Sequence, residues 1–288
     1  MIPKLVVIGV GLIGGSAALA LRREGRVGEV IGVGRSAANL AVAQDRAIID
    51  RATAVYAEAL AGADIVFLAT PVAQFASIFA AIAPHLGAGT VVTDGGSTKQ
   101  DVVAAARSAL GNKFAQFVPA HPIAGTEHSG AAAAFPGLFE NRNVVLAPEP
   151  ETDPGAVERV RAMWEATGAR VVTMTAARHD AIFAAVSHLP HLLAFALVDE
   201  LAVRPDAAEY FEFAASGFRD FTRIASSSPE MWRDIALANR GALLDELRRY
   251  RAQVERMEQI LAAGDGERLA ALFATAQAAR NAWLSGKS

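Results

Sequence analysis

The chain has 288 residues, of which 52% are hydrophobic and 20% charged, and its formal net charge is −3. This composition predicts one large or two ordinary folded domains and gives no reason to expect a nucleic-acid partner. The sequence contains no cysteine, so disulfides, thiolate catalysis and cysteine-ligated metal sites are excluded.

The chain begins with a strand–turn–helix pattern, KLVVIGVGLIGGSAALAL over residues 4–21, which contains G-x-G-x-x-G. In a dinucleotide-binding fold the first glycine makes the turn, the second lets the backbone approach a pyrophosphate, and the third lets the helix pack closely on the strand. Free N–H groups at the helix start then face the anion. The residues predicted to contact a dinucleotide here are Gly9, Gly11, Leu12, Ile13 and Gly14.

Within this stretch, residues 5–21 are apolar apart from Ser16, so a signal peptide, a membrane span and a glycine turn without a nucleotide are alternatives. A span needs about 20 apolar residues, and a signal peptide needs a cleavage site rather than phosphate-loop glycines. The strand before the motif and the helix after it favour the nucleotide. We therefore expect no membrane partner and a cytoplasmic protein.

A second predicted strand, Glu29–Gly34, ends where such folds meet the adenosine ribose. An acidic residue there would accept a hydrogen bond from the 2′-hydroxyl of NAD, but this chain has Arg35 and Ser36. A cation and a hydroxyl suit a 2′-phosphate, so NADP is favoured over NAD. The alternative is that Arg35 stacks on adenine or lies in solvent, and that both cofactors are used.

Two further strands, Asp64–Thr70 and Thr90–Asp94, flank a predicted helix from about Val72 to Pro84. This alternation predicts an α/β fold with a Rossmann-type, doubly wound parallel sheet, whose ligands lie beyond the carboxyl ends of the strands. Ser97 is also placed to cap a helix. The predicted cofactor contacts at this edge are Thr70, Pro71 and Ser97.

A short strand over Gln116–Ala120 is expected to deliver His121 to the same edge, followed by the polar segment HPIAGTEHSG. Imidazole exchanges a proton near neutral pH, so His121 is a candidate base; the alternative is a structural histidine in a turn. Two more strands, at 143–147 and 170–173, enclose a predicted helix at about 154–167.

From Ala176 onward the pattern is helical, which places a domain boundary near Thr175. Residues 1–175 are expected to bind the dinucleotide, and residues 176–288 to form an all-helical substrate and dimerisation domain. Long apolar helices are often shared between protomers, so a homodimer through the C-terminal helices is predicted. The expected helices are Ala176–Val203, Ala207–Ala214, Phe218–Ala225, Glu230–Ala263 and Glu267–Leu284.

Two polar segments lie within these helices. In SHLPH, His188 and His191 share a helix face and Pro190 is expected to kink the helix, but a metal site needs a third ligand, so no metal is expected. In SGFRDFTRIA, Arg219 and Arg223 lie in an apolar segment, and arginine matches a carboxylate well. The alternative is a pair of surface ion pairs with Asp220 or Glu212.

Taken together, these segments resemble the prephenate/arogenate (cyclohexadienyl) dehydrogenase family of tyrosine biosynthesis. The matching segments are GVGLIGGS, TDGGSTK, HPIAGTEHSG, SHLPH and SGFRDFTRIA, and they occur in family order across nearly the whole chain. The resemblance implies a dinucleotide domain followed by a helical dimerisation domain. It also implies oxidative decarboxylation of prephenate, to 4-hydroxyphenylpyruvate, and/or of arogenate, to tyrosine, with hydride transfer to NAD(P).

The resemblance further implies roles for individual residues. His121 would be the base for the substrate hydroxyl, Ser97 would contact that hydroxyl and align the nicotinamide, and Arg219 would pair with a substrate carboxylate. Trp232 is expected to reach across the dimer. Prephenate is expected to be accepted because SHLPH offers no carboxylate to an ammonium group, and arogenate stays open as a second substrate, with Glu127 as the candidate carboxylate. The other residues implied to line the substrate pocket are Ser187, His188, His191, Glu127 and Trp232.

Two other functions remain open. Hydroxyacid dehydrogenases and imine reductases also join a dinucleotide domain to a helical one, but they would not need His121 and Arg219 together. A non-catalytic NADP-binding sensor would bind the cofactor, yet keep its function when His121 is replaced.

Overall fold

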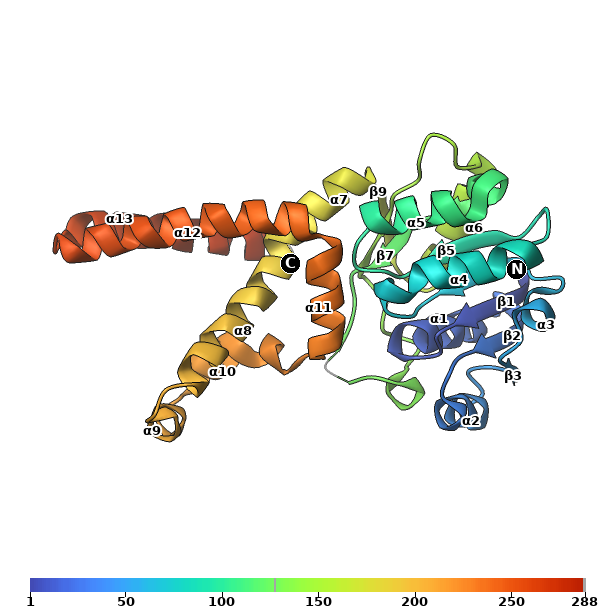
Figure 1. The fold of residues 1–288 in the computed structure, drawn as a ribbon, viewed down its shortest axis with the longest axis horizontal. Helices are drawn as coiled ribbons and strands as arrows, with labels where there is room; N and C mark the ends of the chain where they lie inside the picture. The colour runs from blue at the N-terminus through green and yellow to red at the C-terminus, as the bar shows by residue number, and fades with distance from the viewer. Residues whose placement is uncertain (127, 287–288) are drawn as a thin grey trace. The chain divides into compact units, whose positions relative to one another are not determined.

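The structure, a computed structural model, describes residues 1–126 and 128–286 (Figure 1). The chain forms two compact units, Met1–Arg240 and Gly241–Ser288, which we describe separately. The predicted domain boundary near Thr175 divides the chain differently and stays a prediction.

A six-stranded parallel sheet forms the centre of the first unit, in the order β3-β2-β1-β4-β5-β6. This order confirms the predicted doubly wound sheet. The edge strand β3 is an addition, because three residues are too few to give a strand pattern in the sequence. The strands are β1 (Ile2–Ile8), β2 (Val27–Val33), β3 (Arg51–Thr53), β4 (Ile65–Leu68), β5 (Val91–Asp94) and β6 (Phe117–Val118).

Helices cover both faces of this sheet. Leu5 and Val7 of β1 pack on one face with residues of α1, α2 and α6, whereas Val6 and Ile8 pack on the other with residues of α3, α4 and α5. Strands buried on both faces explain the continuous apolar runs in the sequence. The helices are α1 (Leu12–Arg23), α2 (Ala37–Asp45), α3 (Tyr56–Leu60), α4 (Phe75–Ile82), α5 (Gln100–Leu110) and α6 (Pro154–Glu165).

A second sheet, β7-β8-β9, corrects the prediction for His121. The chain leaves the large sheet after Val118, and β7 (Ala120–Pro122) pairs antiparallel with β8 (Asn143–Leu146), which pairs parallel with β9 (Arg170–Thr173). His121 therefore lies inside a strand, opposite Val145, rather than after one. Pro119 between the two strands supplies no N–H for a ladder.

The remainder of the first unit is helical. A π-helical turn, Ala184–His188, lies between α7 (Ala176–Phe183) and α8 (Leu189–Ala202), so Pro190 falls in the first turn of α8. A π-turn is a common way for a long helix to absorb such an irregularity. The other helices of this unit are α9 (Ala207–Glu212), α10 (Ser216–Thr222) and α11 (Pro229–Ala238).

The predicted single helix from Glu230 to Ala263 is wrong. Helix α11 ends at Ala238, and α12 (Arg240–Ala262) begins after Asn239, whose φ and ψ are −101° and 29°. Asn239 is buried, and its side chain makes hydrogen bonds with α7 and the π-helical turn. The second unit holds α12 and α13 (Gly266–Ser285), which confirms the helical prediction for that segment.

The segment 176–202 is, among the residues that the structure describes, the single helix long and apolar enough to cross a membrane by length and composition. It also contains three buried polar side chains, His179, Asp180 and His188. Each makes hydrogen bonds with other parts of the first unit, as described below. Of its most apolar 18-residue window, 28% is buried, and these contacts tie the helix to the rest of the first unit.

Candidate active site

The glycine turn after β1 has the geometry that a dinucleotide requires. Gly9 has a φ of +96°, and a Cβ on Gly14 would lie 2.4 Å from the carbonyl oxygen of Gly9, so neither position accepts a side chain. Among the residues that the structure describes, a Cβ on Gly11 would have no heavy atom within 4 Å, and no side chain caps the N-terminus of α1. The open space above Gly11 and the uncapped N–H groups can therefore hold a pyrophosphate.

The residues predicted to contact the adenosine ribose follow the end of β2. Arg35 and Ser36 are both exposed, and the Ser36 Oγ accepts a hydrogen bond of 3.2 Å from the backbone N–H of Asn39, which caps α2. After β4, Thr70 is partly exposed and its Cγ2 lies close to the turn at Gly9. These residues, with the exposed Pro71, flank the glycine turn.

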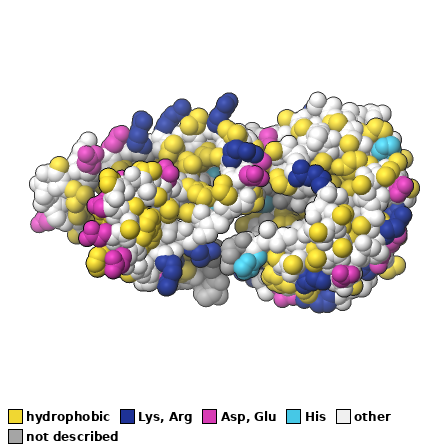
Figure 2. All heavy atoms as spheres, turned by 60° about the horizontal axis from the view of Figure 1, so that its bottom comes forward, with side chains coloured by type: hydrophobic (Ala, Val, Ile, Leu, Met, Phe, Trp, Pro, Cys, Tyr) yellow, Lys and Arg dark blue, Asp and Glu magenta, His cyan; other side chains and the backbone are white. Residues whose placement is uncertain are grey.

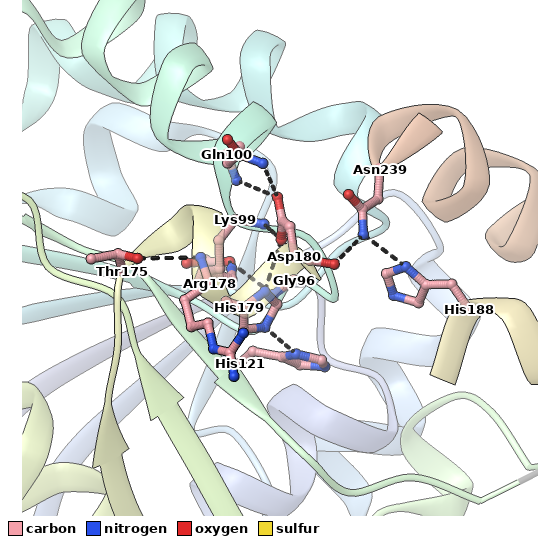
Figure 3. A network of polar contacts seen from close by, with 11 residues as sticks. Gly96, Lys99, Gln100, His121, Thr175, Arg178, His179, Asp180, His188 and Asn239 are labelled. Atoms are coloured by element: carbon pink, nitrogen blue, oxygen red, sulfur yellow. Dashed lines mark hydrogen bonds and ion pairs between the residues drawn. The ribbon is translucent and has the colours of Figure 1, made fainter. Parts of the chain in front are cut away.

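His121 and two residues of α7 form a hydrogen-bonded chain (Figure 3). The Nδ1 of His121 lies 2.8 Å from the Nε2 of His179, and the Nδ1 of His179 lies 2.8 Å from Oδ1 of Asp180. His179 and Asp180 are fully buried, whereas His121 is partly exposed. The structure thus joins a predicted site residue to two residues that the sequence analysis did not single out.

Asp180 also holds the start of α5. Its carboxylate accepts hydrogen bonds from the backbone N–H of Lys99 (2.8 Å) and of Gln100 (2.9 Å). Burial alone would raise the pKa of Asp180, but the hydrogen bonds from His179, Gln100 and Lys99 outweigh it and lower the pKa. Asp180 is therefore a carboxylate at neutral pH, and it ties α7 to the helix that follows the TDGGSTK turn.

A buried ion pair lies within that turn. The Nζ of Lys99 is 2.5 Å from Oδ2 of Asp94, and neither side chain is exposed. Asp94 also accepts hydrogen bonds from the backbone N–H of Gly96 (2.8 Å) and of Ala120 (2.9 Å). Burial raises the pKa of Asp94, and the Lys99 ammonium and these two N–H groups oppose that effect. The pair therefore links the end of β5, the turn that contains Ser97, and β7.

The histidines near this turn are neutral at neutral pH. Burial holds the pKa of His121 well below its usual range, and a charge on His179, Lys99 or His188 would lower it further. Burial likewise lowers the pKa of His179, and it lowers that of His188 to about 4. A neutral imidazole can accept a proton, so His121 has the protonation state that a base needs.

The SHLPH segment reaches this turn through His188. Asn239 donates hydrogen bonds from Nδ2 to the Nδ1 of His188 (3.1 Å) and to the backbone oxygen of Asp180 (2.8 Å). The ring of His188 also interacts with the backbone of Ser97. His188 therefore contributes to the packing around Ser97 from the helical side.

His191 lies one turn further along. Its Nδ1 donates a hydrogen bond of 3.0 Å to the backbone oxygen of Ser187. Its ring stacks on Trp232, with centroids 3.5 Å apart and an interplanar angle of 19°. Trp232, which is expected to reach across a dimer, contacts His191 of its own chain.

Arg219 stands apart from these contacts. Its side chain is 81% exposed, and its Nε lies 3.9 Å from Oδ1 of Asp220. The surface ion pair considered in the sequence analysis is thus the arrangement found, and Arg219 is not part of the hydrogen-bonded network around His121. Glu127 lies outside the described residues. Among residues 1–126 and 128–286, no group of three or more histidine, aspartate and glutamate side chains is placed to hold a metal ion.

Five network residues were not predicted. Asp94 and Lys99 stand in the TDGGSTK segment, and a charged pair around a glycine turn could have indicated them. His179 and Asp180 open an apolar helix, where adjacent polar residues are a weaker signal. Nothing in the sequence around Asn239 indicates a role in this network, because it lies in an otherwise ordinary helical pattern.

Comparisons with known proteins agree with this arrangement. Residues 17–173 match the family model described as prephenate dehydrogenase, nucleotide-binding domain, and residues 175–275 match prephenate dehydrogenase, dimerization domain. The prephenate dehydrogenase of Bacillus subtilis is 37% identical over 276 residues, which are 95% of this chain and 74% of that protein. The cyclohexadienyl dehydrogenase of Zymomonas mobilis is 34% identical over 96% of this chain and 94% of its own length.

A solved structure is similar over its whole length. The prephenate dehydrogenase from A. aeolicus, in complex with hydroxyphenyl propionate and NAD+, has a TM-score of 0.92 and 35% sequence identity. The alignment covers 97% of this chain and 98% of that one. The sheet, the glycine turn and the helical segment described above therefore occur together in a known dehydrogenase fold.

Proposed function

The chain belongs to the prephenate dehydrogenase family, and we propose that it oxidatively decarboxylates prephenate, accepts arogenate as a second substrate, and uses NADP in preference to NAD. The observation that carries this proposal is the state of His121. Its imidazole is neutral, is held at Nδ1 by His179, and is partly exposed. A base of this kind is what a substrate hydroxyl needs at the moment of oxidation.

For this reaction the protein must bind the hydroxyl group of the substrate and its two anionic ends. His121 takes the hydroxyl proton as the carbinol carbon is oxidised, and Ser97 supports the same hydroxyl from the TDGGSTK turn. The bond to the ring carboxylate then breaks, its electron pair enters the ring as CO2 departs, and the oxygen regains a proton as a phenol. When bound, the nicotinamide cofactor supplies the hydride acceptor.

The glycine turn and the residues beside it would hold that cofactor. Gly11 leaves space for the pyrophosphate at the N-terminus of α1, with Gly9 and Gly14 shaping the turn and Leu12 and Ile13 beginning the helix. Thr70, Pro71 and Ser97 are proposed to border the nicotinamide end.

At the other end of the substrate, Arg219 is proposed to pair with a carboxylate. Its exposed guanidinium offers a planar fork of donors, and its pairing with Asp220 across 3.9 Å is loose enough to exchange. We further propose that Ser187, His188, His191 and Trp232 line the pocket, and that Glu127 does so as well.

Initial rates test the reaction. Formation of reduced cofactor is measured with prephenate or arogenate, each with NADP or NAD, for the wild type and for His121→Asn. We expect turnover with prephenate, and a loss of about 10²- to 10⁴-fold in kcat for the variant, with cofactor binding retained. No turnover in any combination, with NADP still bound, would contradict the assignment.

NADP preference rests on the end of β2. Arg35 is exposed there beside Ser36, and residues 34–36 contain no carboxylate that could accept from a ribose hydroxyl. We expect Arg35→Asp to shift the ratio of kcat/KM toward NAD by about 10- to 100-fold, because it replaces a cation with an acceptor. An unchanged ratio would show that Arg35 does not read the 2′-phosphate.

We also propose a cytoplasmic homodimer. Large apolar side chains are exposed on the helices of the first unit, and Figure 2 shows hydrophobic side chains spread over the visible surface. The match of residues 175–275 to a dimerization domain supports self-association. Sedimentation velocity at several protein concentrations tests it, and a monomer throughout would contradict it. The exposed residues on these helices or directly after them include Leu197, Val203, Tyr210, Phe211, Phe213, Phe221 and Leu237.

A further inference from the structure

We propose that His179 and Asp180 are positioning residues that keep the proton of neutral His121 on Nδ1, so that Nε2 is the atom that accepts the substrate proton. This inference deepens the proposed function and rests on it. The observation behind it is the continuous chain from Asp180 through His179 to His121, with 2.8 Å at each of its two steps.

The protons in this chain can be assigned one after another. An ionised carboxylate is an acceptor only, so the Nδ1 of His179 carries a proton and donates it to Asp180. A neutral imidazole has a single N–H, so the Nε2 of His179 has none and must accept. The donor to it is the Nδ1 of His121, which leaves the Nε2 of His121 without a proton.

Asp180 is held in the acceptor state by its other partners. The backbone N–H groups of Lys99 and Gln100 donate to its two carboxylate oxygens, and the Nε2 of Gln100 lies 3.4 Å from one of them. A protonated Asp180 would turn a hydrogen toward groups that are themselves donors. The donor-to-acceptor direction of the hydrogen-bonded chain is therefore set by Asp180 of α7, whose carboxylate is held by the N–H groups at the beginning of α5.

The residues packed around His121 prevent its Nδ1 from forming a hydrogen bond with another partner. The ring of Phe183 packs against His121 with centroids 5.0 Å apart and against His179 with centroids 4.5 Å apart. His179 is fully buried, and Asn239 donates to the backbone oxygen of Asp180, which fixes α7 from a second side. A reversed order of donors and acceptors would place two lone pairs against each other between His179 and Asp180, which is costly at a buried site.

The same arrangement helps His121 after it takes the proton. Burial makes the imidazolium unfavourable, and this is why the pKa of His121 is low. The negative charge of Asp180, transmitted through the hydrogen-bonded His179, opposes that cost when the proton is transferred. A base with a low resting pKa can then still accept a proton in the transition state.

Two substitutions of His179 distinguish a role in positioning the proton of His121 from a purely structural role. The terminal oxygen of glutamine reaches about as far as the Nε2 of histidine, so His179→Gln keeps an acceptor for His121. The amide of asparagine reaches only as far as Nδ1, so His179→Asn keeps the contact with Asp180 and loses the acceptor. We expect His179→Asn to lower kcat by about 10²- to 10³-fold, with KM and cofactor Kd nearly unchanged, and His179→Gln to recover at least about tenfold of that loss.

Phe183→Leu is the matched packing control, because it loosens both rings but keeps both hydrogen bonds. Its kcat is expected to fall far less than that of His179→Asn. If His179→Asn is at least as active as His179→Gln, the role of His179 is to anchor Asp180, and the proposal is wrong.

The tautomer itself is measured without substrate, by ¹⁵N NMR of histidine-labelled wild-type protein at neutral pH. The signals of His121 are identified by their loss in His121→Asn among the six histidines of the chain. We expect a protonated Nδ1 and an unprotonated Nε2 for His121, whereas a proton on Nε2 would overturn the inference. Because this measurement needs no turnover, it stands even if the proposed substrate is wrong or a His179 variant does not fold.

Discussion

Two ion pairs in this chain, Asp94–Lys99 and Arg219–Asp220, are built in opposite ways. The first has both side chains fully buried and an N–O distance of 2.5 Å. The second leaves 81% and 77% of its side chains exposed, with an N–O distance of 3.9 Å. The first pair belongs to the network around His121, where we place the chemistry, and the second lies where we propose that a substrate carboxylate binds.

Burial explains the difference. A carboxylate removed from water needs a full set of partners, and Asp94 has an ammonium and two backbone N–H groups. An exposed arginine keeps its hydration, so it has no need of a protein partner before the substrate arrives. The part of the site around His121 is therefore already ordered in the free protein. The part proposed to bind the substrate carboxylate keeps an exposed arginine that can accept a new partner.

The largest expected effect comes from breaking the buried pair. Lys99→Met leaves Asp94 as an unpaired buried charge, and we expect the free energy of unfolding to fall by about 3–5 kcal/mol. Arg219→Met is the matched control at the exposed pair, where the expected change is below about 1 kcal/mol. Urea unfolding of both variants measures the contrast, and equal losses would show that burial does not distinguish the two pairs.

The pH dependence of stability gives the next effect. The pKa of His188 is about 4 in the folded protein, below its usual 6.5, because burial disfavours the charged ring. The unfolded chain therefore takes up a proton first, and stability present above pH 6.5 is lost as the pH falls toward 4. From this group alone, we expect a loss of about 3 kcal/mol over that window.

Urea unfolding at several pH values in that window measures this loss. In His188→Asn the titrating ring is absent while an acceptor near the Nδ1 position can be kept for Asn239, so the stability of this variant should fall less steeply with acid than that of the wild type. His121 and His179 also have lowered pKa values and add losses of the same sign in both proteins. Parallel curves for the two proteins would contradict the role given to His188.

Substitution of Arg219 should have the smallest effect on stability and the most specific effect on substrate binding. Arg219→Met is expected to raise KM for prephenate by about 10- to 100-fold, the loss of one charge-assisted pair, with stability nearly unchanged. Arg223→Met, four residues later and also exposed, is the matched control and should change KM less. If Arg223→Met has the larger effect, the wrong arginine has been assigned to the carboxylate.

Sequence reasoning succeeded where the chemistry is local. The spacing of Gly9, Gly11 and Gly14 predicted a turn in which one glycine has a φ of +96°, one lies under open space and one packs against backbone, as the structure shows. These requirements act between residues a few positions apart. The prediction of one helix over residues 230–263 was wrong because the break at Asn239 depends on residues far away in the sequence. These partners are Asp180 in α7 and His188 in the π-helical turn.

The sequence by itself determined the doubly wound sheet, the glycine turn and the helical second half, whereas His121 and Ser97 as reactive groups stay a prediction from the family resemblance. Periodic burial and backbone conformation leave a local record in the order of residues. Only the tertiary structure decided that His121 lies inside β7, that His179 and Asp180 stand behind it, and that Lys99 pairs with Asp94. Residues 121 and 179 are far apart in the chain, and the pairing of their ring nitrogens arises only when β7 and α7 are packed together.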